Sequence, residues 1–190
     1  MNNEAIGHEH QGRELDTQLA RDVAAVLRDI PDFPQPGVTF KDFTPLLADA
    51  QLSRRVVADV VGRHHGHADV VAGIEARGFV FGAVVSQQLG VGFVPIRKAG
   101  KLPCDTYTVE YELEYGQATL EMHVDAVRPG QRVLVVDDVL ATGGTVAATI
   151  ELIRRAGAQV VGVEVVLEIS ALQGRARLPG GVAVQALLAH

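Results

Sequence analysis

Two adjacent acids, Asp137 and Asp138, stand directly after a run of aliphatic residues at 133–136. A turn of small residues, 141–145, comes next, followed by a helical pattern that Gly157 ends. This order predicts a buried strand, a tight loop and a helix N-terminus. Backbone N–H groups there are unpaired and the helix dipole favours negative charge, so the loop suits a phosphate group. Carboxylates at the carboxyl end of the strand then suit sugar hydroxyls or a metal-bound polyphosphate.

Cations stand at the ends of two other predicted strands. Arg77 lies in the turn between the short apolar strand 70–74 and a helix. Three cations follow the strand 91–96, namely Arg97, Lys98 and Lys101. These turns are either exposed and solvated or, if the phosphate site exists, a clamp for a polyphosphate, which Lys suits as a point charge.

A stretch rich in proline and glycine, residues 33–43, carries three of the six phenylalanines of the chain. The prolines and the glycine fix a rigid, non-helical path. Phe33 and Phe43 are interpreted as anchors to the core. Phe40 is either a third anchor or a stacking platform for a flat heterocycle.

Residues 106–115 and 117–124 alternate in character on either side of Gly116. This pattern predicts a two-stranded hairpin, with Val109 and Tyr111 on one face and glutamates on the other. A parallel core does not need such an excursion, and long excursions over a ligand site are often lids that exclude water. We therefore predict a lid.

Hydrophobic periodicity predicts the elements that hold these residues. Helices are expected over 15–30 and 51–65, and further buried strands over 160–167 and 182–188, the last at a sheet edge. Strands that alternate with helices predict an α/β fold with a twisted, mainly parallel sheet.

The two ends of this pattern and its histidines need separate interpretations. Residues 1–12 are polar and predict a disordered tail, so that residues 13–190 form a single domain. The run RHHGH at 63–67 is interpreted as a solvated helix end rather than a metal site, because no acid or Cys stands at a ligand spacing.

Composition excludes several classes of protein. The chain has 190 residues, of which 47% are hydrophobic and 5% aromatic, and its net charge is −6. An acidic protein without a basic face is not expected to bind nucleic acid. A single Cys allows no intrachain disulfide, and no apolar run approaches the length of a membrane span. These observations predict a cytoplasmic protein.

The stretch VVDDVLATGGT at 135–145 resembles the motif with which type I phosphoribosyltransferases bind phosphoribosyl pyrophosphate. Four further segments closely resemble the adenine phosphoribosyltransferase family: FPQPGVTFKDFTPLL at 33–47, GIEARGFVFG at 73–82, VPIRKAGKLP at 94–103 and LEYG at 113–116. The similarity covers about residues 15–170. It implies the fold of that family, with a hairpin lid and a small hood, and Mg²⁺-dependent transfer of a 5-phosphoribosyl group to adenine.

The same resemblance implies roles for residues that bind the sugar phosphate and pyrophosphate. The 5-phosphate would bind to Ala141, Thr142, Gly143, Gly144 and Thr145. Asp137 and Asp138 would accept hydrogen bonds from the ribose hydroxyls, directly or through water on a Mg²⁺ that the substrate mainly holds. Pyrophosphate would bind to Arg77, Arg97, Lys98 and Lys101. In the family the basic loop can reach across a homodimer interface into the neighbouring subunit's site.

For the base, the resemblance implies stacking between Phe40 on one face and Val139 or Leu140 on the other. The backbone of Thr39 and Lys41 would read the Watson–Crick edge. Glu114 and Tyr115 match a Glu-Tyr pair in the lid of the family, and with Arg77 they are the implied catalytic residues. Glu114 would handle the imidazole-ring proton of adenine.

Two other functions remain open from the sequence. One is a phosphoribosyltransferase for another base, such as xanthine, guanine or orotate. The other is a regulator that binds phosphoribosyl pyrophosphate without catalysis. A regulator would need a surface for DNA or RNA, and neither a basic face nor a helix-turn-helix segment is visible.

Overall fold

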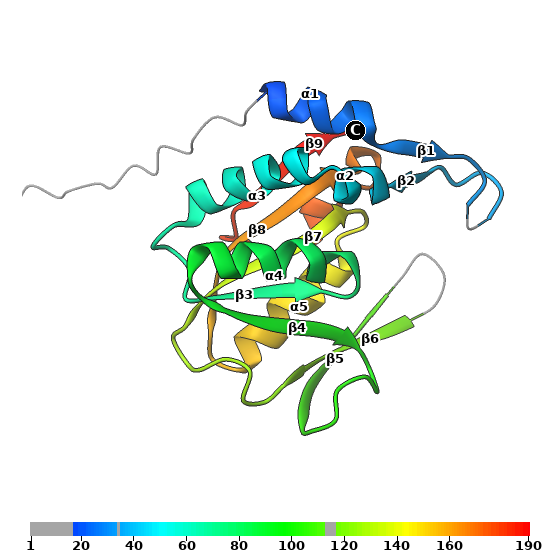
Figure 1. Cartoon of the computed structure of the whole chain (residues 1–190). Coiled ribbons are helices and arrows are strands. Elements are labelled where there is room, and N and C mark those ends of the chain that lie inside the picture. The colour runs from blue at the N-terminus through cyan, green and yellow to red at the C-terminus, as the bar shows by residue number, and fades with distance from the viewer. Residues whose placement is uncertain (1–16, 34, 113–116) are drawn as a thin grey trace, which may run out of the picture.

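A seven-stranded sheet forms the centre of the computed structural model, which describes residues 17–33, 35–112 and 117–190 (Figure 1). The spatial order is β5-β6-β4-β3-β7-β8-β9. Neighbours from β4 to β9 are parallel, whereas β6 pairs antiparallel with β4 and with β5. The strands are β3 (Val70–Ile74), β4 (Gly92–Lys98), β5 (Thr106–Glu112), β6 (Gln117–His123), β7 (Arg132–Leu140), β8 (Gln159–Glu168) and β9 (Val184–Ala189). The predicted mainly parallel α/β fold is confirmed, and β9 lies at an edge as predicted.

Helices cover both faces of the sheet (Figure 1). Helices α3 (Ala50–His64) and α4 (Arg77–Leu89) pack on one face and α5 (Gly144–Arg155) on the other. Each face buries its own cluster of Val, Leu and Ile side chains, as expected for a parallel sheet that is covered on both sides. Asp49 caps the N-terminus of α3, where its carboxylate accepts from two backbone N–H groups, and Gly90 caps the C-terminus of α4 in the left-handed conformation.

A small hood lies beside the end of the sheet and contains the first part of the described chain. It consists of α1 (Thr17–Val26), the antiparallel pair β1 (Arg28–Ile30) and β2 (Phe40–Asp42), and α2 (Thr44–Ala48). The predicted helix over 15–30 is wrong at its end, because the last residues form β1. Pairing with the distant β2 overrides the local helical period, and the Arg28–Asp42 ion pair at 2.6 Å reinforces it.

The predicted hairpin is present as β5 and β6, which extend from the sheet beyond β4 (Figure 1). Its tip, residues 113–116, lies outside the described residues, as do the predicted tail 1–12 and residues 13–16. After β8, two short 3-10 helices, η1 (Ser170–Leu172) and η2 (Gly174–Arg177), lead toward β9. No helix in the described part of the chain is long and apolar enough to cross a membrane.

Candidate active site

The loops that follow β3, β4 and β7 lie side by side at the carboxyl ends of these strands, because the three strands are parallel neighbours (Figure 1). The first carries Arg77, the second follows Arg97 and Lys98 and carries Lys101, and the third is the turn 141–143. The separate stretches that the sequence analysis singled out therefore lie together at the carboxyl ends of the strands, where open α/β sheets bind ligands.

The turn after β7 leaves the N-terminus of α5 open. Gly143 precedes the helix with φ +82°, a conformation that suits glycine. Among the described residues, no side chain caps the first turn of α5. The unpaired N–H groups of this turn are therefore available to an anion.

The segment after β8 packs directly on this turn. A side chain at Gly174 would overlap the carbonyl oxygen of Ala141, and one at Gly143 would overlap the carbonyl oxygen of Gly174. Arg175 holds the segment in place by an ion pair with Glu168, at 2.7 Å, and a hydrogen bond to the Val184 carbonyl. In the sequence Gly174 is only a glycine next to Arg175, and nothing there predicts its contact with this turn.

Asp137 and Asp138 are both buried, with 8% and 5% of their surface exposed. Burial, followed by the charge of Asp138, raises the pKa of Asp137 well above its ordinary value. Burial also raises the pKa of Asp138, although the guanidinium of Arg77 opposes that rise. Two carboxylates in this position favour a partner that supplies hydroxyl donors or positive charge.

Arg77 connects the acid pair to the aromatic hood. Its Nε lies 2.6 Å from Asp138 Oδ2, yet this buried oxygen has no aligned hydrogen-bond donor among the described residues. The guanidinium also lies over two rings, 5.1 Å from the ring centre of Phe40 and 5.7 Å from that of Phe43. Phe33, which is half exposed, meets Phe40 edge to face at 5.2 Å, whereas Phe43 is fully buried as an anchor.

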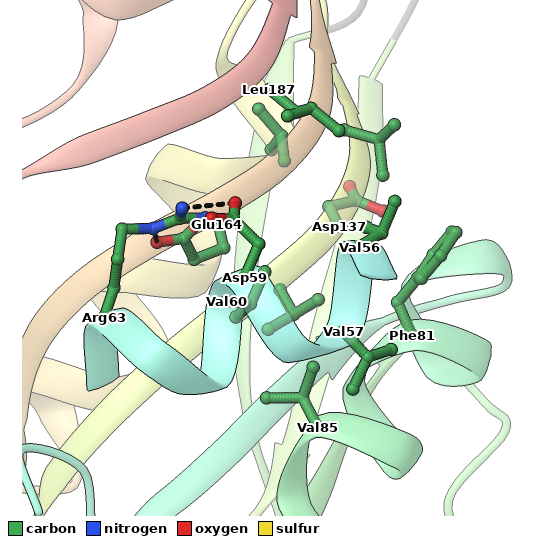
Figure 2. A pocket seen from close by; sticks show the side chains of 13 residues that line it. Val56, Val57, Asp59, Val60, Arg63, Phe81, Val85, Asp137, Glu164 and Leu187 are labelled. Atoms are coloured by element: carbon green, nitrogen blue, oxygen red, sulfur yellow. Dashed lines mark hydrogen bonds and ion pairs between the residues drawn. The ribbon is translucent and has the colours of Figure 1, made fainter. Parts of the chain in front are cut away.

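A small cavity of about 20 Å³ lies behind the acid pair, between α3, α4 and the sheet. Figure 2 shows Asp137 at one end of it and Asp59, Arg63 and Glu164 at the other. A cavity of this size holds about one water molecule, so it is too small for a nucleobase or a sugar phosphate.

The charged group at the far end of this cavity corrects one interpretation. Arg63 pairs with Glu164 at 2.8 Å and with Asp59, and His64 Nε2 lies 2.6 Å from Glu164. The run 63–67 is therefore not simply a solvated helix end, since its first two side chains are mostly buried against β8. The sequence could not show that Glu164 points toward α3.

The basic residues after β4 divide into two kinds. Arg97 donates to Glu75 through Nε at 3.3 Å and Nη2 at 3.1 Å, so its charge is already paired. Lys98 and Lys101 are exposed, and neither forms an ion pair with any residue in the described ranges. Only these two ammonium groups are free to meet an anionic ligand.

The residues expected to surround a base differ in accessibility. Phe40 is half-buried and Thr39 exposed. The Lys41 ammonium pairs with Asp29 at 2.6 Å and therefore points into the hood. Val139 is half-buried, whereas Leu140 is fully buried in the cluster under α5. Glu114 and Tyr115 lie outside the described residues.

An open turn at a helix N-terminus, an acid pair and unpaired lysines lie together at the carboxyl ends of the strands, and the fold is that of a type I phosphoribosyltransferase. The family model of the phosphoribosyl transferase domain matches residues 43–177. An adenine phosphoribosyltransferase of Acidothermus cellulolyticus is 59% identical over 167 residues, covering 87% of this chain and 94% of that protein. This chain therefore belongs to the adenine phosphoribosyltransferase family.

Solved structures of that family have the same fold. The crystal structure of adenine phosphoribosyltransferase from Rhodothermus marinus gives a TM-score of 0.87 at 46% identity, covering 91% of this chain and 99% of that chain. The Saccharomyces cerevisiae enzyme, complexed with an imino-altritol bisphosphate and adenine, gives 0.86 at 36% identity, covering 90% and 99%. The family consists of pentosyltransferases of purine salvage, and this chain is an enzyme of that class.

Proposed function

We propose that this protein transfers the 5-phosphoribosyl group of phosphoribosyl pyrophosphate to adenine and releases AMP and pyrophosphate. The observation that carries the proposal is the position of Arg77, which lies between the Phe40 ring and the Asp138 carboxylate. A base platform and a sugar site are thereby adjacent, with the open turn of α5 beside them. The reaction needs that arrangement, because the base and the anomeric carbon must approach each other.

The sugar phosphate binds between the turn of α5 and the acid pair in our proposal. Backbone N–H groups of residues 141–145 and the hydroxyls of Thr142 and Thr145 hold the 5-phosphate. Asp137 and Asp138 accept from the ribose hydroxyls. Asp138 Oδ2 supports this role, because it has no aligned hydrogen-bond donor in the described part of the chain although Arg77 lies beside it, and a hydroxyl donor would satisfy it.

The pyrophosphate end binds to Lys98, Lys101 and Arg77. Arg77 must then exchange its partner, since its guanidinium now lies against Asp138. Asp138 is thereby freed for the ribose as Arg77 turns to the leaving group. Arg97 contributes by holding the loop through Glu75 rather than by contacting pyrophosphate itself.

Adenine stacks on Phe40, with Val139 as the second contact because Leu140 is buried beneath the sheet edge. The Watson–Crick edge is read by backbone groups of Thr39 and Lys41. Support for backbone rather than side-chain reading comes from Lys41, whose ammonium is already paired with Asp29.

Mg²⁺ belongs to the proposal as the partner of the substrate. Across residues 17–33, 35–112 and 117–190, no group of three or more His, Cys, Asp or Glu side chains is arranged to hold a metal. The acid pair fits a Mg²⁺ held mainly by substrate oxygens, through water on Asp137 or Asp138, because hard carboxylate oxygens suit this ion. When bound, Mg²⁺ neutralises charge on the leaving pyrophosphate.

In the reaction the bond from the anomeric carbon to pyrophosphate breaks and the bond to the base nitrogen forms, while positive charge builds on the ribose ring. The chain supplies orientation of the base against the sugar, cations at the leaving group and exclusion of water. Glu114 accepts the imidazole-ring proton of adenine as the new bond forms, and Tyr115 is its neighbour in the sequence of the lid. The pairing of β5 with β6 supports these roles, because the two residues lie between these strands in the sequence.

A homodimer in the cytoplasm completes the proposal. Val80 and Val84 are 48% and 42% exposed on α4, the helix that begins at Arg77, and their apolar surface supports contact with a second copy. Sedimentation of the purified protein measures its oligomeric state.

The single cysteine of the chain, Cys104, is free and exposed, which supports a reducing compartment.

The test is release of pyrophosphate and formation of AMP from phosphoribosyl pyrophosphate, measured with adenine, guanine, xanthine and orotate, with and without Mg²⁺. We expect turnover with adenine that depends on Mg²⁺ and little with the other bases. Faster turnover with another base would reassign the substrate. Binding of phosphoribosyl pyrophosphate without turnover of any base would indicate a regulator instead.

A further inference from the structure

Glu121, in the hairpin strand β6, is a charged residue outside the expected site that is only 4% exposed. Its carboxylate accepts three backbone hydrogen bonds from the basic loop after β4. Gly100 N donates to Oε2 at 3.1 Å, and Lys101 N and Leu102 N donate to Oε1, each at 2.7 Å. A buried carboxylate with three donors on one short loop fixes the path of that loop.

The shape of the loop makes this contact possible. Gly100 has φ +81°, which turns the chain so that three successive N–H groups converge. Such a concave group of N–H donors binds anions. Burial raises the pKa of the Glu121 carboxyl, but the three N–H groups together outweigh burial and hold that pKa below its ordinary value.

A second carboxylate holds the start of the same loop. Glu75 accepts from the Arg97 guanidinium and from Lys98 N at 3.1 Å. The backbone donors and the guanidinium of the loop are therefore occupied by the protein's own carboxylates. What remains for a ligand is the pair of side-chain ammonium groups of Lys98 and Lys101.

Glu121 also connects the loop to the hairpin. In the register of β4 and β6 it lies opposite Arg97, and Ala99 N donates to the Thr119 carbonyl of the same strand at 3.0 Å. Strand β6 in turn pairs along its whole length with β5. The direction in which the two lysines project is thus set by the strand that forms one side of the hairpin.

We propose that Glu121 is a positioning residue for pyrophosphate, which shapes the loop so that Lys98 and Lys101 reach the leaving group. This inference rests on the proposed function, because it takes these two lysines as the pyrophosphate ligands. Glu121 itself touches no substrate, since its oxygens are buried against loop N–H groups.

The first test is Glu121→Gln, which keeps the shape of the side chain. The amide has one acceptor oxygen in place of two, and its NH₂ group cannot accept from the loop N–H groups. We expect the KM for phosphoribosyl pyrophosphate to rise by about tenfold, the lower range for a hydrogen bond to a charged group. The KM for adenine should change by less than about twofold. Glu110→Gln is the matched control, because Glu110 is an exposed carboxylate of the same hairpin, and it should leave both values unchanged.

The second test is a double-mutant cycle with Lys101→Ala. Because Glu121 acts through Lys98 and Lys101, Glu121→Gln should raise the KM for phosphoribosyl pyrophosphate by clearly less in the Lys101→Ala background, in which only Lys98 remains, than in the otherwise unchanged chain. Glu121→Ala, if it folds, should exceed the effect of Glu121→Gln in the otherwise unchanged chain.

Additive effects of the two substitutions would overturn the proposal, as would equal rises in the KM for adenine and for phosphoribosyl pyrophosphate. A lower unfolding temperature with both KM values unchanged would show a purely structural role and overturn it as well. These results are distinguishable from failure of the proposed function, in which the unsubstituted protein would form no AMP.

Discussion

At the scale of single residues, the acid pair places function and stability in opposition. Folding buries Asp137 beside Asp138, which raises the pKa of Asp137 above its ordinary value of 3.8. Between pH 3.8 and the raised pKa, the folded state keeps the proton of Asp137, whereas the unfolded chain has mostly released it. A rise in pH through this window therefore costs stability, and at neutral pH the pair destabilises the fold.

Asp137→Asn should stabilise the protein at pH 7 and impair it as an enzyme. Removal of the buried charge should raise the unfolding midpoint by about 2–4 °C for each kcal/mol gained. Loss of a carboxyl oxygen that accepts from the ribose hydroxyls should lower kcat/KM for phosphoribosyl pyrophosphate by about 10–100-fold. Calorimetry and steady-state kinetics measure the two effects.

The pH dependence provides the control for this variant. The stability advantage of Asp137→Asn should shrink as the pH falls toward 4, because the unfolded chain then also binds the proton that the folded state already holds at Asp137, and the cost of keeping it disappears. An advantage that is constant with pH would mean that the charge of Asp137 is not its source.

Lys101→Ala should lower kcat/KM for phosphoribosyl pyrophosphate by about 10²–10³-fold, because it removes a cation at the leaving group. Arg154→Ala is the matched control, since Arg154 is an exposed cation at the far end of α5. Near-normal kinetics of Lys101→Ala, measured with saturating adenine, would remove this residue from the pyrophosphate site.

At the scale of elements, the segment η1–η2 packs against the turn after β7, residues 141–143, and supports it. Glu168 at the end of β8 holds Arg175, and the neighbouring Gly174 lies against the backbone of Ala141 and Gly143. The turn that we propose binds the 5-phosphate is thus supported by a segment about thirty residues further along the chain.

Gly174→Ala should displace the turn, because the added carbon would overlap the Ala141 carbonyl oxygen. We expect the KM for phosphoribosyl pyrophosphate to rise by about tenfold or more, as loss of geometry at one contact typically costs. Gly180→Ala is the control, since no atom lies near the position of its added carbon. Similar kinetics for the two variants would show that the segment η1–η2 does not shape the turn.

The sequence predicted those elements whose hydrophobic period agrees with their final structure. Strand β3 matches its predicted limits, and the turn after β7 was found from its small residues. Pairings between distant residues were not predictable. The strand β1, the contact of Glu121 with the basic loop and the contact of Gly174 with the turn each depend on a partner that local sequence does not reveal.

At the scale of the whole molecule, one sheet brings the three loops after β3, β4 and β7 together at the carboxyl ends of the strands, and the hood adds the Phe40 ring beside Arg77 (Figure 1). A ligand that contacts several of these loops at once should stabilise the entire fold. Phosphoribosyl pyrophosphate with Mg²⁺ spans more of them than ribose 5-phosphate, which lacks the pyrophosphate end.

Thermal unfolding should reflect this difference. At a concentration 100 times its Kd, a ligand that binds only the folded state adds about 2.7 kcal/mol. For a chain of this size that raises the unfolding midpoint by about 5–10 °C. Ribose 5-phosphate at the same concentration should give a clearly smaller shift, and equal shifts would mean that the basic loop makes no contact with pyrophosphate.

The most direct test of the account is a crystal structure of the protein with Mg²⁺, phosphoribosyl pyrophosphate and 9-deazaadenine, whose carbon in place of the reacting nitrogen prevents transfer. We predict the 5-phosphate on residues 141–145, the base on Phe40, and Arg77 moved from Asp138 to the pyrophosphate. A base bound away from Phe40, or Arg77 still paired with Asp138 while the ribose is bound elsewhere, would contradict the account.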